Sequence, residues 1–284
     1  MFNMKKILFT GGTGFLGRNL VPELKEKYNI YAPTRKELNL KDLDLVDDYI
    51  RRNSFDVIIH AAIPNIAFNA SDKETNLLKD SLGIFLKLYQ LQDYYGKMIY
   101  FGSGAEYGKQ YPIVNVSEED FGKILPETDY GMAKYIMNML CRESKKIYNF
   151  RIFGCYGPTD ADFKLITYVI RRCLENKTIE LNRDCKFDYM WVKDIVPVLE
   201  YFIENTPQFH DYNVCSGTSV RITEIADMIR NEMQASSEIT IKESGDGNEY
   251  SGNNTRVVSE VKNLKFTPLY EGIKKQINYE VEAR

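Results

Sequence analysis

Side chains that bind metals or form disulfides are scarce in this sequence. Its 284 residues include two histidines, His60 and His210, which are too few for a histidine-rich metal centre. The five cysteines are scattered, odd in number and without C-x-x-C spacing, which argues against a zinc site and a disulfide framework. We therefore expect no bound metal, reduced thiols and a cytoplasmic protein.

An excess of one charge and long apolar runs are also missing. The formal net charge is −3 without a block of like charge, so nothing indicates a nucleic-acid or membrane partner. Near the N-terminus, two lysines precede an apolar run that reaches glycines after four residues. This run is too short for a signal peptide or a membrane-spanning helix, and we expect it to form a strand.

What the first half does contain is an alternation of short β-rich runs and helical stretches. We expect strands at 5–11, 29–34, 55–62 and 97–103, helices at 15–28, 42–53, 75–95 and from 129, and an extended segment at 148–158. This alternation predicts a parallel sheet covered by helices on both faces. Beyond Pro158 the pattern is less regular, which indicates a smaller second α/β domain.

A glycine-rich turn, TGGTGFLG at 10–17, follows the first expected strand and opens the first expected helix. Its glycines fit both G-x-x-G-x-x-G and G-x-G-x-x-G spacing, which allows a tight turn and a close approach of backbone to a pyrophosphate. The helix N-terminus would supply N–H groups and a positive dipole end for the phosphates. The pattern predicts a Rossmann-type, doubly wound sheet that binds a dinucleotide. The residues expected to contact it are Gly11, Thr13, Gly14, Phe15, Leu16 and Gly17.

The residue that reads the adenosine ribose is expected at the end of the second strand, in YAPTRKEL. Arg35 lies there with no carboxylate before it, which favours NADP(H), because an arginine accommodates a 2′-phosphate. NAD(H) remains open, since Glu37 would accept from a ribose hydroxyl if Arg35 were a solvated charge.

Three side chains form a candidate catalytic set. Ser103 comes just past a strand, where ligands bind in parallel α/β sheets. Tyr130 and Lys134 are four residues apart on the next helix and therefore share one face. Taken alone, the pair could be a surface cation–aromatic contact and Ser103 a strand-end cap. Together with the dinucleotide motif, they favour catalysis.

The chain resembles an extended short-chain dehydrogenase/reductase of the nucleotide-sugar epimerase/dehydratase/reductase group. GGTGFLG, FDVIIHAA, GSGAEYG, YGMAK, RIFGCYGP and WVKDI occur in the order found in that family. The resemblance implies that residues 1–157 and roughly 186–216 bind the dinucleotide. It implies that 158–185 and 217–284 form a substrate-binding domain, that the substrate is a nucleotide-linked sugar, and that a homodimer is compatible with this organisation.

The same resemblance implies roles for single residues. Tyr130 would relay a proton while a hydride moves to or from the nicotinamide, and Ser103 would position the reacting oxygen. Lys134 would favour the phenolate of Tyr130 and hold the nicotinamide ribose. The residues implied to lie beside the cofactor are Asn39 and Leu40 at the adenine, Ala61 and Ala62 at close approach, and His60 as a packed neighbour.

Departures from the family pattern narrow the reaction. Dehydratases of the group carry Asp-Glu directly after the active-site hydroxyl residue, and 3,5-epimerising members carry a cysteine at the position of Ala105. Here Gly104 and Ala105 follow Ser103, so neither reaction is expected. The segment TRKELNLKD resembles 4-keto-sugar reductases, which makes reduction the favoured reaction. A nucleotide-sugar 4-epimerase uses the same three residues and stays open, as does a non-catalytic NAD(P)-binding regulator.

Three further departures concern the substrate side. Gly154 replaces the usual asparagine, Phe187 replaces the usual arginine that serves the substrate diphosphate, and Asp80 replaces a helix asparagine. The candidates that would replace the missing arginine are Lys186, Arg183 and Arg256.

Overall fold

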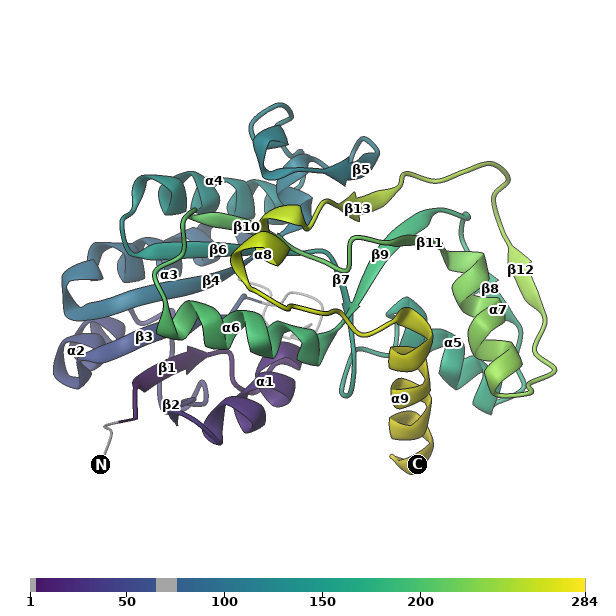
Figure 1. The fold of residues 1–284 in the computed structure, drawn as a ribbon, viewed down its shortest axis with the longest axis horizontal. Helices are drawn as coiled ribbons and strands as arrows, with labels where there is room; N and C mark the ends of the chain where they lie inside the picture. Colours follow the sequence, from purple (N-terminus) through teal and green to yellow (C-terminus); the bar gives the residue numbers. More distant parts are fainter. Residues whose placement is uncertain (1–3, 65–75, 284) are drawn as a thin grey trace.

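The computed structural model of the chain describes residues 4–64 and 76–283, and its larger unit is built on a parallel sheet (Figure 1). The strands are β1 (Lys6–Thr10), β2 (Asn29–Tyr31), β3 (Phe55–His60), β4 (Tyr95–Ser103), β6 (Ile147–Ile152) and β10 (Asp211–Val214). Their order is β10-β6-β4-β3-β1-β2, with every pair parallel. The predicted doubly wound sheet is thus confirmed. β1 lies between β2 and β3, so the direction in which strands are added to the sheet reverses beside β1. Doubly wound sheets bind ligands at such a topological switch point.

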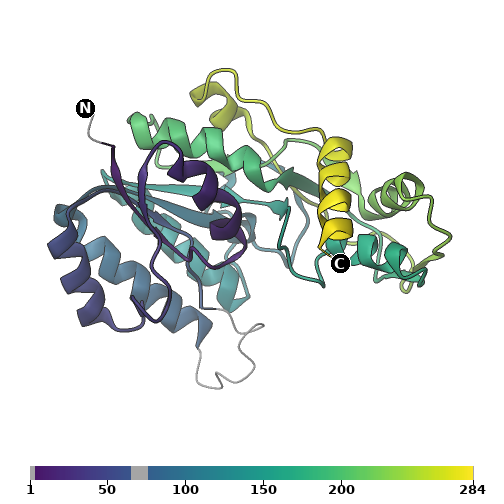
Figure 2. The same cartoon turned by 90° about the horizontal axis from the view of Figure 1, so that it is seen from below.

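Helices cover both faces of this sheet (Figures 1 and 2). One face carries α1 (Phe15–Lys25) and α6 (Ile195–Glu204), and the other carries α2 (Leu43–Asn53), α3 (Leu77–Gln90) and α4 (Asp129–Glu143). Because the strands are buried on both sides, runs such as Ile7–Phe9 and Val57–Ile59 are apolar throughout. Each face therefore has its own apolar core.

The helix expected at 75–95 corresponds to α3, although Thr75 lies outside the described residues. Its expected end is wrong: the chain leaves the helix at Leu91, and β4 begins at Tyr95. The Tyr95 hydroxyl donates to the carbonyl oxygen of Leu88 at 2.8 Å, so this aromatic residue belongs to the strand and anchors the preceding turn.

The smaller unit contains a second sheet and three helices. Its sheet has the order β11-β9-β13-β5 with β7 beside β9, and a separate pair joins β12 to β8. The strands are β5 (Ile113–Val116), β7 (Gly154–Tyr156), β8 (Ile179–Leu181), β9 (Lys186–Trp191), β11 (Ser219–Arg221), β12 (Ile239–Ile241) and β13 (Tyr250–Gly252). The helices α5 (Leu165–Leu174), α7 (Ile222–Glu232) and α9 (Leu269–Glu282) share one apolar core.

The chain passes between the units several times. β9 lies in the second sheet, α6 and β10 return to the first unit, and α8 (Thr255–Glu260) packs its Val257 into the core of that unit. The domain boundaries expected from the sequence stay a prediction. A small apolar cluster, Tyr107, Ile113, Phe153, Cys215 and Tyr250, joins the carboxyl end of the first sheet to the second sheet.

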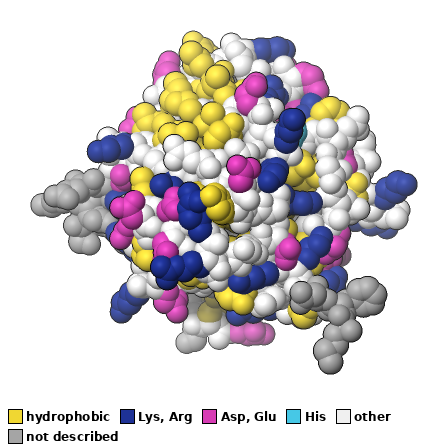
Figure 3. Space-filling model, turned by 90° about the vertical axis from the view of Figure 1, so that its left-hand side faces the viewer, with side chains coloured by type: hydrophobic (Ala, Val, Ile, Leu, Met, Phe, Trp, Pro, Cys, Tyr) yellow, Lys and Arg dark blue, Asp and Glu magenta, His cyan; other side chains and the backbone are white. Residues whose placement is uncertain are grey.

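The outer surface has mixed charge. Basic and acidic side chains are interspersed over the face in Figure 3, and apolar side chains gather on its upper part. Among the described residues, no helix is both long and apolar enough to cross a membrane.

Candidate active site

The glycine-rich turn is tightly packed where β1 runs into α1. Gly11 has a φ of +78°, and a β-carbon there would lie 2.8 Å from the backbone nitrogen of Ala62. A β-carbon on Gly17 would collide with Gly11 and Gly12, so this glycine lets the helix sit against the turn. Gly14 is the N-cap of α1 and provides no side-chain cap, which leaves the first-turn N–H groups to a ligand. This cradle fits a pyrophosphate.

Side chains around the turn divide into exposed and packed ones. Thr13 is exposed, whereas Phe15, Leu16 and Ala61 are partly buried against the apolar core under α1. Ala62 is also partly buried, and its N–H points to the Thr10 hydroxyl at 3.4 Å. The small residues after β3 thus stand directly beside the turn, as the sequence predicts.

His60 is a packed residue, as expected. Its Nδ1 lies 2.8 Å from the Thr10 hydroxyl, and its ring stacks on Tyr100 at 5.8 Å. Burial and the nearby charge of Lys134 lower the pKa of His60 to about 3, so the ring is neutral at physiological pH. The contact between His60 and Thr10 joins the ends of β3 and β1 next to the glycine-rich turn.

In the turn after β2, the carboxylate of Glu37 forms hydrogen bonds within the turn itself. Glu37 accepts from the Thr34 backbone N–H at 2.7 Å and from the Thr34 hydroxyl at 2.9 Å, and these bonds lower the pKa of Glu37. Arg35 is exposed beside it. Asn39 accepts from the Lys41 N–H, and Leu40 packs against the core under α2 and α3.

Ser103 is both a cap and a residue that faces the site. Its hydroxyl oxygen accepts from the Ala105 N–H at 3.1 Å, and its own N–H donates to the Glu106 carboxylate at 3.1 Å. Capping uses the oxygen as an acceptor and leaves the hydroxyl hydrogen to donate. The two interpretations of Ser103 that the sequence allows are therefore compatible.

Tyr130 and Lys134 lie on the face of α4 that is turned toward Ser103. The Lys134 ammonium is 5.8 Å from the centre of the Tyr130 ring and 4.5 Å from that of Tyr100, and it donates to the carbonyl oxygen of Phe101 at 2.7 Å. Lys134 is 6% exposed, and burial lowers its pKa to about 8, against the opposing charge of Glu106. A hydrogen bond with the Ser103 side chain is among the influences on the pKa of Tyr130. The structure thus brings the three predicted residues together.

The surroundings of the Tyr130 hydroxyl act on its pKa in the direction that keeps the proton. The pKa of Tyr130 is raised above its ordinary value, and the expectation that Lys134 and a positively charged nicotinamide favour the phenolate stays a prediction. Loss of solvent around the hydroxyl is the main cause, and the charge of Glu106 adds to it, while the bond with Ser103 opposes both. Tyr130 therefore carries its proton at neutral pH.

A second tyrosine, Tyr250, stands at the same hydroxyl and was missed at the sequence level. Its hydroxyl lies 3.5 Å from that of Ser103, and its ring packs on Phe153 at 5.1 Å and on Phe187 at 5.4 Å. It arrives on β13 from a polar stretch without a recognisable motif. Pairing of β13 with β5 and β9 brings it to the end of β4.

Packing around Gly104 explains the missing acidic pair. A β-carbon at Gly104 would lie 2.6 Å from the Tyr250 hydroxyl and 2.7 Å from the Phe153 ring, so a larger side chain there would require these two rings to move. Ala105 is 3% exposed, and its carbonyl oxygen faces Gly131 of α4. A carboxylate at either position would require this part of the site to be rebuilt.

A buried charge network lies behind Ser103. Arg151 is fully buried and donates to Glu106 and to Asp211, both at 2.6 Å. Asn149 also donates to Glu106, and Arg142 donates to Asp211 at 2.7 Å. Burial raises the pKa of Glu106, whereas its cationic and hydrogen-bonding partners lower it. The network joins the ends of β4, β6 and β10.

The three residues that depart from the family pattern on the substrate side, Gly154, Asp80 and Phe187, fit their surroundings in the structure. A β-carbon on Gly154 would collide with the backbone of Asp188, because β7 and β9 approach closely there. Asp80 pairs with Lys41 at 2.8 Å. The Phe187 ring stacks between Tyr189 and Tyr250 and forms part of an aromatic wall.

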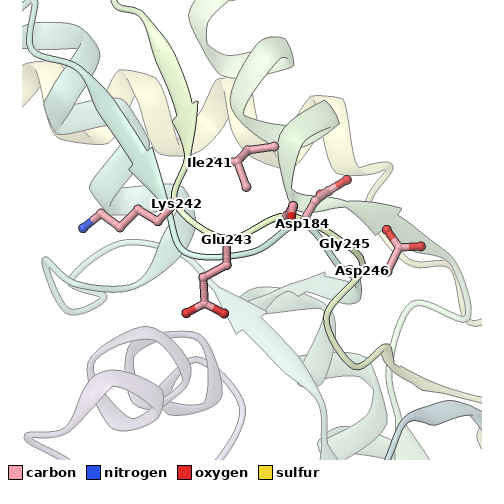
Figure 4. Close-up of a pocket in the computed structure, with 7 residues that line it drawn as sticks. Asp184, Ile241, Lys242, Glu243, Gly245 and Asp246 are labelled. Carbon is pink, nitrogen blue, oxygen red and sulfur yellow. The ribbon is translucent and has the colours of Figure 1, made fainter.

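The cations proposed to replace the missing arginine are engaged elsewhere. Arg256 is bound to Asp211, Glu118 and Glu119, and Arg183 pairs with Glu243. Glu243 lines an acidic hollow in the smaller unit, which contains none of the predicted site residues (Figure 4). That hollow is lined by Asp184 and Ile241–Asp246. The charge of Lys186 acts on Asp246 at its rim.

Among the described residues, no three histidine, cysteine, aspartate or glutamate side chains are grouped so that they could hold a metal ion.

A family model and several known proteins resemble the chain. The model described as "NAD dependent epimerase/dehydratase family" matches residues 7–215. A stretch of 59 residues is 46% identical to GDP-L-fucose synthase of Azorhizobium caulinodans, covering 20% of this chain and 19% of that enzyme. Over 235 residues the chain is 26% identical to GDP-6-deoxy-D-talose 4-dehydrogenase of Aggregatibacter actinomycetemcomitans, covering 79% of each.

Solved structures share the whole fold at low identity. UDP-glucose 4-epimerase of Thermotoga maritima has a TM-score of 0.82 at 19% identity and covers 98% of this chain and 99% of its own. MlghC, a GDP-mannoheptose C4 reductase of Campylobacter jejuni with NADP bound, has a TM-score of 0.83 at 18% identity and covers 99% of both chains. These similarities establish the fold.

Proposed function

Because the chain belongs to the NAD-dependent epimerase/dehydratase family, we propose that it reduces the 4-keto group of a nucleotide-linked sugar with NADP(H). Its family and relatives indicate a nucleotide-sugar modifying enzyme. Reduction, as distinct from another modification of the sugar, is the more specific part of the proposal. The observation that carries it is the close packing of Gly104 under Tyr250 and Phe153 beside a Ser103, Tyr130 and Lys134 set.

The cofactor would lie across the carboxyl ends of β1 and β3. The turn at Gly11, Gly14 and Gly17 would hold its pyrophosphate, with Ala61 and Ala62 alongside. The dihydronicotinamide supplies the hydride when it is bound. Lys134, fixed to the Phe101 carbonyl at the end of β4, would hold the nicotinamide ribose.

The chain's own residues supply the proton. Reduction of a ketone adds one hydride to the carbon and one proton to the oxygen. Tyr130 is protonated at neutral pH because its pKa is raised, so it can donate that proton to the keto oxygen. The Ser103 hydroxyl hydrogen is not used in the cap, so it would turn from the neighbouring tyrosine hydroxyls to the same oxygen and stabilise its growing negative charge.

Elimination of water needs a carboxylate at the sugar, and the neighbourhood of Ser103 has no room for one at Gly104. Hydride transfer at a carbon that bears oxygen needs only the relay of Tyr130, Lys134 and Ser103. The packing therefore supports hydride transfer and disfavours 4,6-dehydration.

NADP(H) is proposed over NAD(H) because of the turn after β2. Glu37 is held by Thr34 through two hydrogen bonds, whereas the guanidinium of Arg35 is exposed at the end of that strand. An exposed guanidinium there suits a 2′-phosphate.

The test uses purified protein, NADPH and the 4-keto-6-deoxy sugars linked to GDP, dTDP, UDP and CDP. We expect one of these substrates to consume one NADPH for each 4-hydroxy product, followed by absorbance of NADPH and by chromatography of the sugar. Isomerisation of a 4-hydroxy sugar nucleotide with no net change of cofactor would establish the 4-epimerase instead. Loss of water from such a sugar would show that the argument from Gly104 is wrong.

A further inference from the structure

The proposed substrate carries a diphosphate, yet two of the three cations expected to bind it are engaged elsewhere, and the charge of the third, the exposed Lys186, acts on Asp246 at the rim of the acidic hollow. Phe187 is part of an aromatic wall, Arg256 is bound to three carboxylates, and Arg183 pairs with Glu243 of the acidic hollow. Arg221, on neighbouring β11, is likewise bound to Asp184 and Asp246. A cation from another segment is therefore needed.

Lys109 lies in the segment between Tyr107 and β5, close to the catalytic set. Its ammonium is 4.1 Å from the centre of the Tyr250 ring, and the hydroxyl of that ring lies 3.5 Å from the Ser103 hydroxyl. The positive charge is thus separated from the proposed reaction centre by one phenol ring. Phe187 packs against the same ring, so Lys109 and the position of the missing arginine both contact Tyr250.

Lys164, at the N-cap of α5, adds a second positive charge. It lies close enough to Lys109 for its charge, together with burial, to lower the pKa of Lys109. Among residues 4–64 and 76–283, no carboxylate lies within ion-pair distance of either lysine. Burial raises the pKa of Asp160 to about 6, and the charge of Lys164 opposes this rise. An anion placed between the lysines would relieve their repulsion.

We propose that Lys109, assisted by Lys164, binds the diphosphate of the sugar nucleotide in place of the arginine that Phe187 replaces. This inference rests on the proposed function. In a pyranose, C4 and C1 lie on opposite sides of the ring, so a sugar with C4 at Ser103 has its anomeric phosphate about one ring away. Lys109 stands at that separation, with Tyr250 beside the sugar.

The experiment measures binding, not turnover. Dissociation constants of inorganic pyrophosphate, UDP, GDP, CDP and dTDP are measured by calorimetry on protein saturated with NADPH. The variants are Lys109→Gln, Lys164→Gln and their combination. Lys145→Gln is the matched control, because Lys145 is exposed just beyond the C-terminal end of α4.

We expect Lys109→Gln to weaken binding of pyrophosphate and of the tightest nucleoside diphosphate about tenfold, because a charge-assisted contact is lost. The double variant should lose more, Lys145→Gln nothing, and NADPH affinity should stay unchanged in all of them. Unchanged diphosphate binding in Lys109→Gln would overturn the inference, and so would a wild-type protein that binds none of these ligands.

The experiments distinguish failure of the anion site from failure of the proposed reaction. If diphosphates bind through Lys109 but no keto sugar consumes NADPH, the anion site stands and the proposed reaction fails. If NADPH is consumed and diphosphate binding ignores Lys109, the reaction stands and the anion site fails.

Discussion

Tyr130 depends on neighbours that a sequence motif shows only in part. The spacing of Tyr130 and Lys134 on one helix, and Ser103 after a strand, were sufficient to predict that they meet, because helix periodicity and the carboxyl ends of parallel strands are regular. The direction in which the pKa of Tyr130 shifts was not predictable, since it depends on burial and on Glu106 in the turn after Ser103.

Replacing Tyr130 by phenylalanine removes the proton donor and leaves the ring. We expect Tyr130→Phe to lower kcat about 10²–10⁴-fold and to leave the dissociation constant of NADPH unchanged. Steady-state kinetics and fluorescence titration measure these two quantities. Tyr94→Phe, at an exposed ring stacked by Arg51 away from the site, is the control. A Tyr130→Phe enzyme with wild-type kcat would contradict the assignment.

The proposed preference for NADP(H) rests on a single side chain, Arg35. We expect Arg35→Ala to weaken NADPH binding about tenfold and to leave NADH binding nearly unchanged, because only NADPH carries the additional phosphate. The neighbouring Lys36→Ala serves as the control in the same titrations. If the unmodified protein binds NADH more tightly than NADPH, Arg35 has no role and Glu37 becomes the candidate reader.

Tyr250 and Lys109 are two residues near Ser103 that could not be identified from the sequence. Tyr250 is 147 residues from Ser103 in sequence, and only the pairing of β13 with β5 and β9 places it there. Lys109 has no motif around it. Contacts formed by such long-range pairing leave no local pattern in a single sequence.

At the scale of elements, the regular strands and helices of the first unit were predictable and the short strands of the second were not. β1, β3 and β4 appear in the sequence as short, continuous apolar runs because each is buried on both faces, and their helices show helical periodicity. Several strands of the smaller unit have only three residues, such as β7, β11 and β13, which is too few for a period to appear. The expected extended segment at 148–158 is in fact divided into β6 and β7.

The buried network at the ends of β4, β6 and β10 makes these three strands depend on one another. We expect Arg151→Met to lower the free energy of unfolding by about 3–5 kcal/mol, because Glu106 and Asp211 would keep their buried charges without this partner. Urea unfolding followed by circular dichroism measures the loss.

A second variant separates charge from packing in this network. Adding Glu106→Gln to Arg151→Met removes the buried carboxylate that loses its ion pair, whereas Asp211 keeps Arg142 and Arg256. The double variant should therefore be more stable than Arg151→Met alone. Equal stability of Arg151→Met and the wild type would show that the buried ion pairs do not hold these strands together.

At the scale of the whole molecule, the reaction centre is shared between two units. Ser103, Tyr130 and Lys134 come from the first unit, whereas Tyr250 comes from the second. The α/β class and the dinucleotide cradle follow from the alternation and from the glycines. The way in which the second unit closes over Ser103 could be known only from the structure, because β5 leaves the first half of the chain to pair with β13 (Figure 1).

The order of the strands also has a consequence for synthesis. The parallel sheet receives its last strand, β10, only at residues 211–214, and β5 has no partner until residues 250–252 are made. A nascent chain therefore leaves the ribosome with the edge of β6 unpaired and with β5 alone for much of translation. Unpaired edges attract other extended chains. We therefore expect a chain truncated before β10 to aggregate more readily than the full chain, which light scattering would measure.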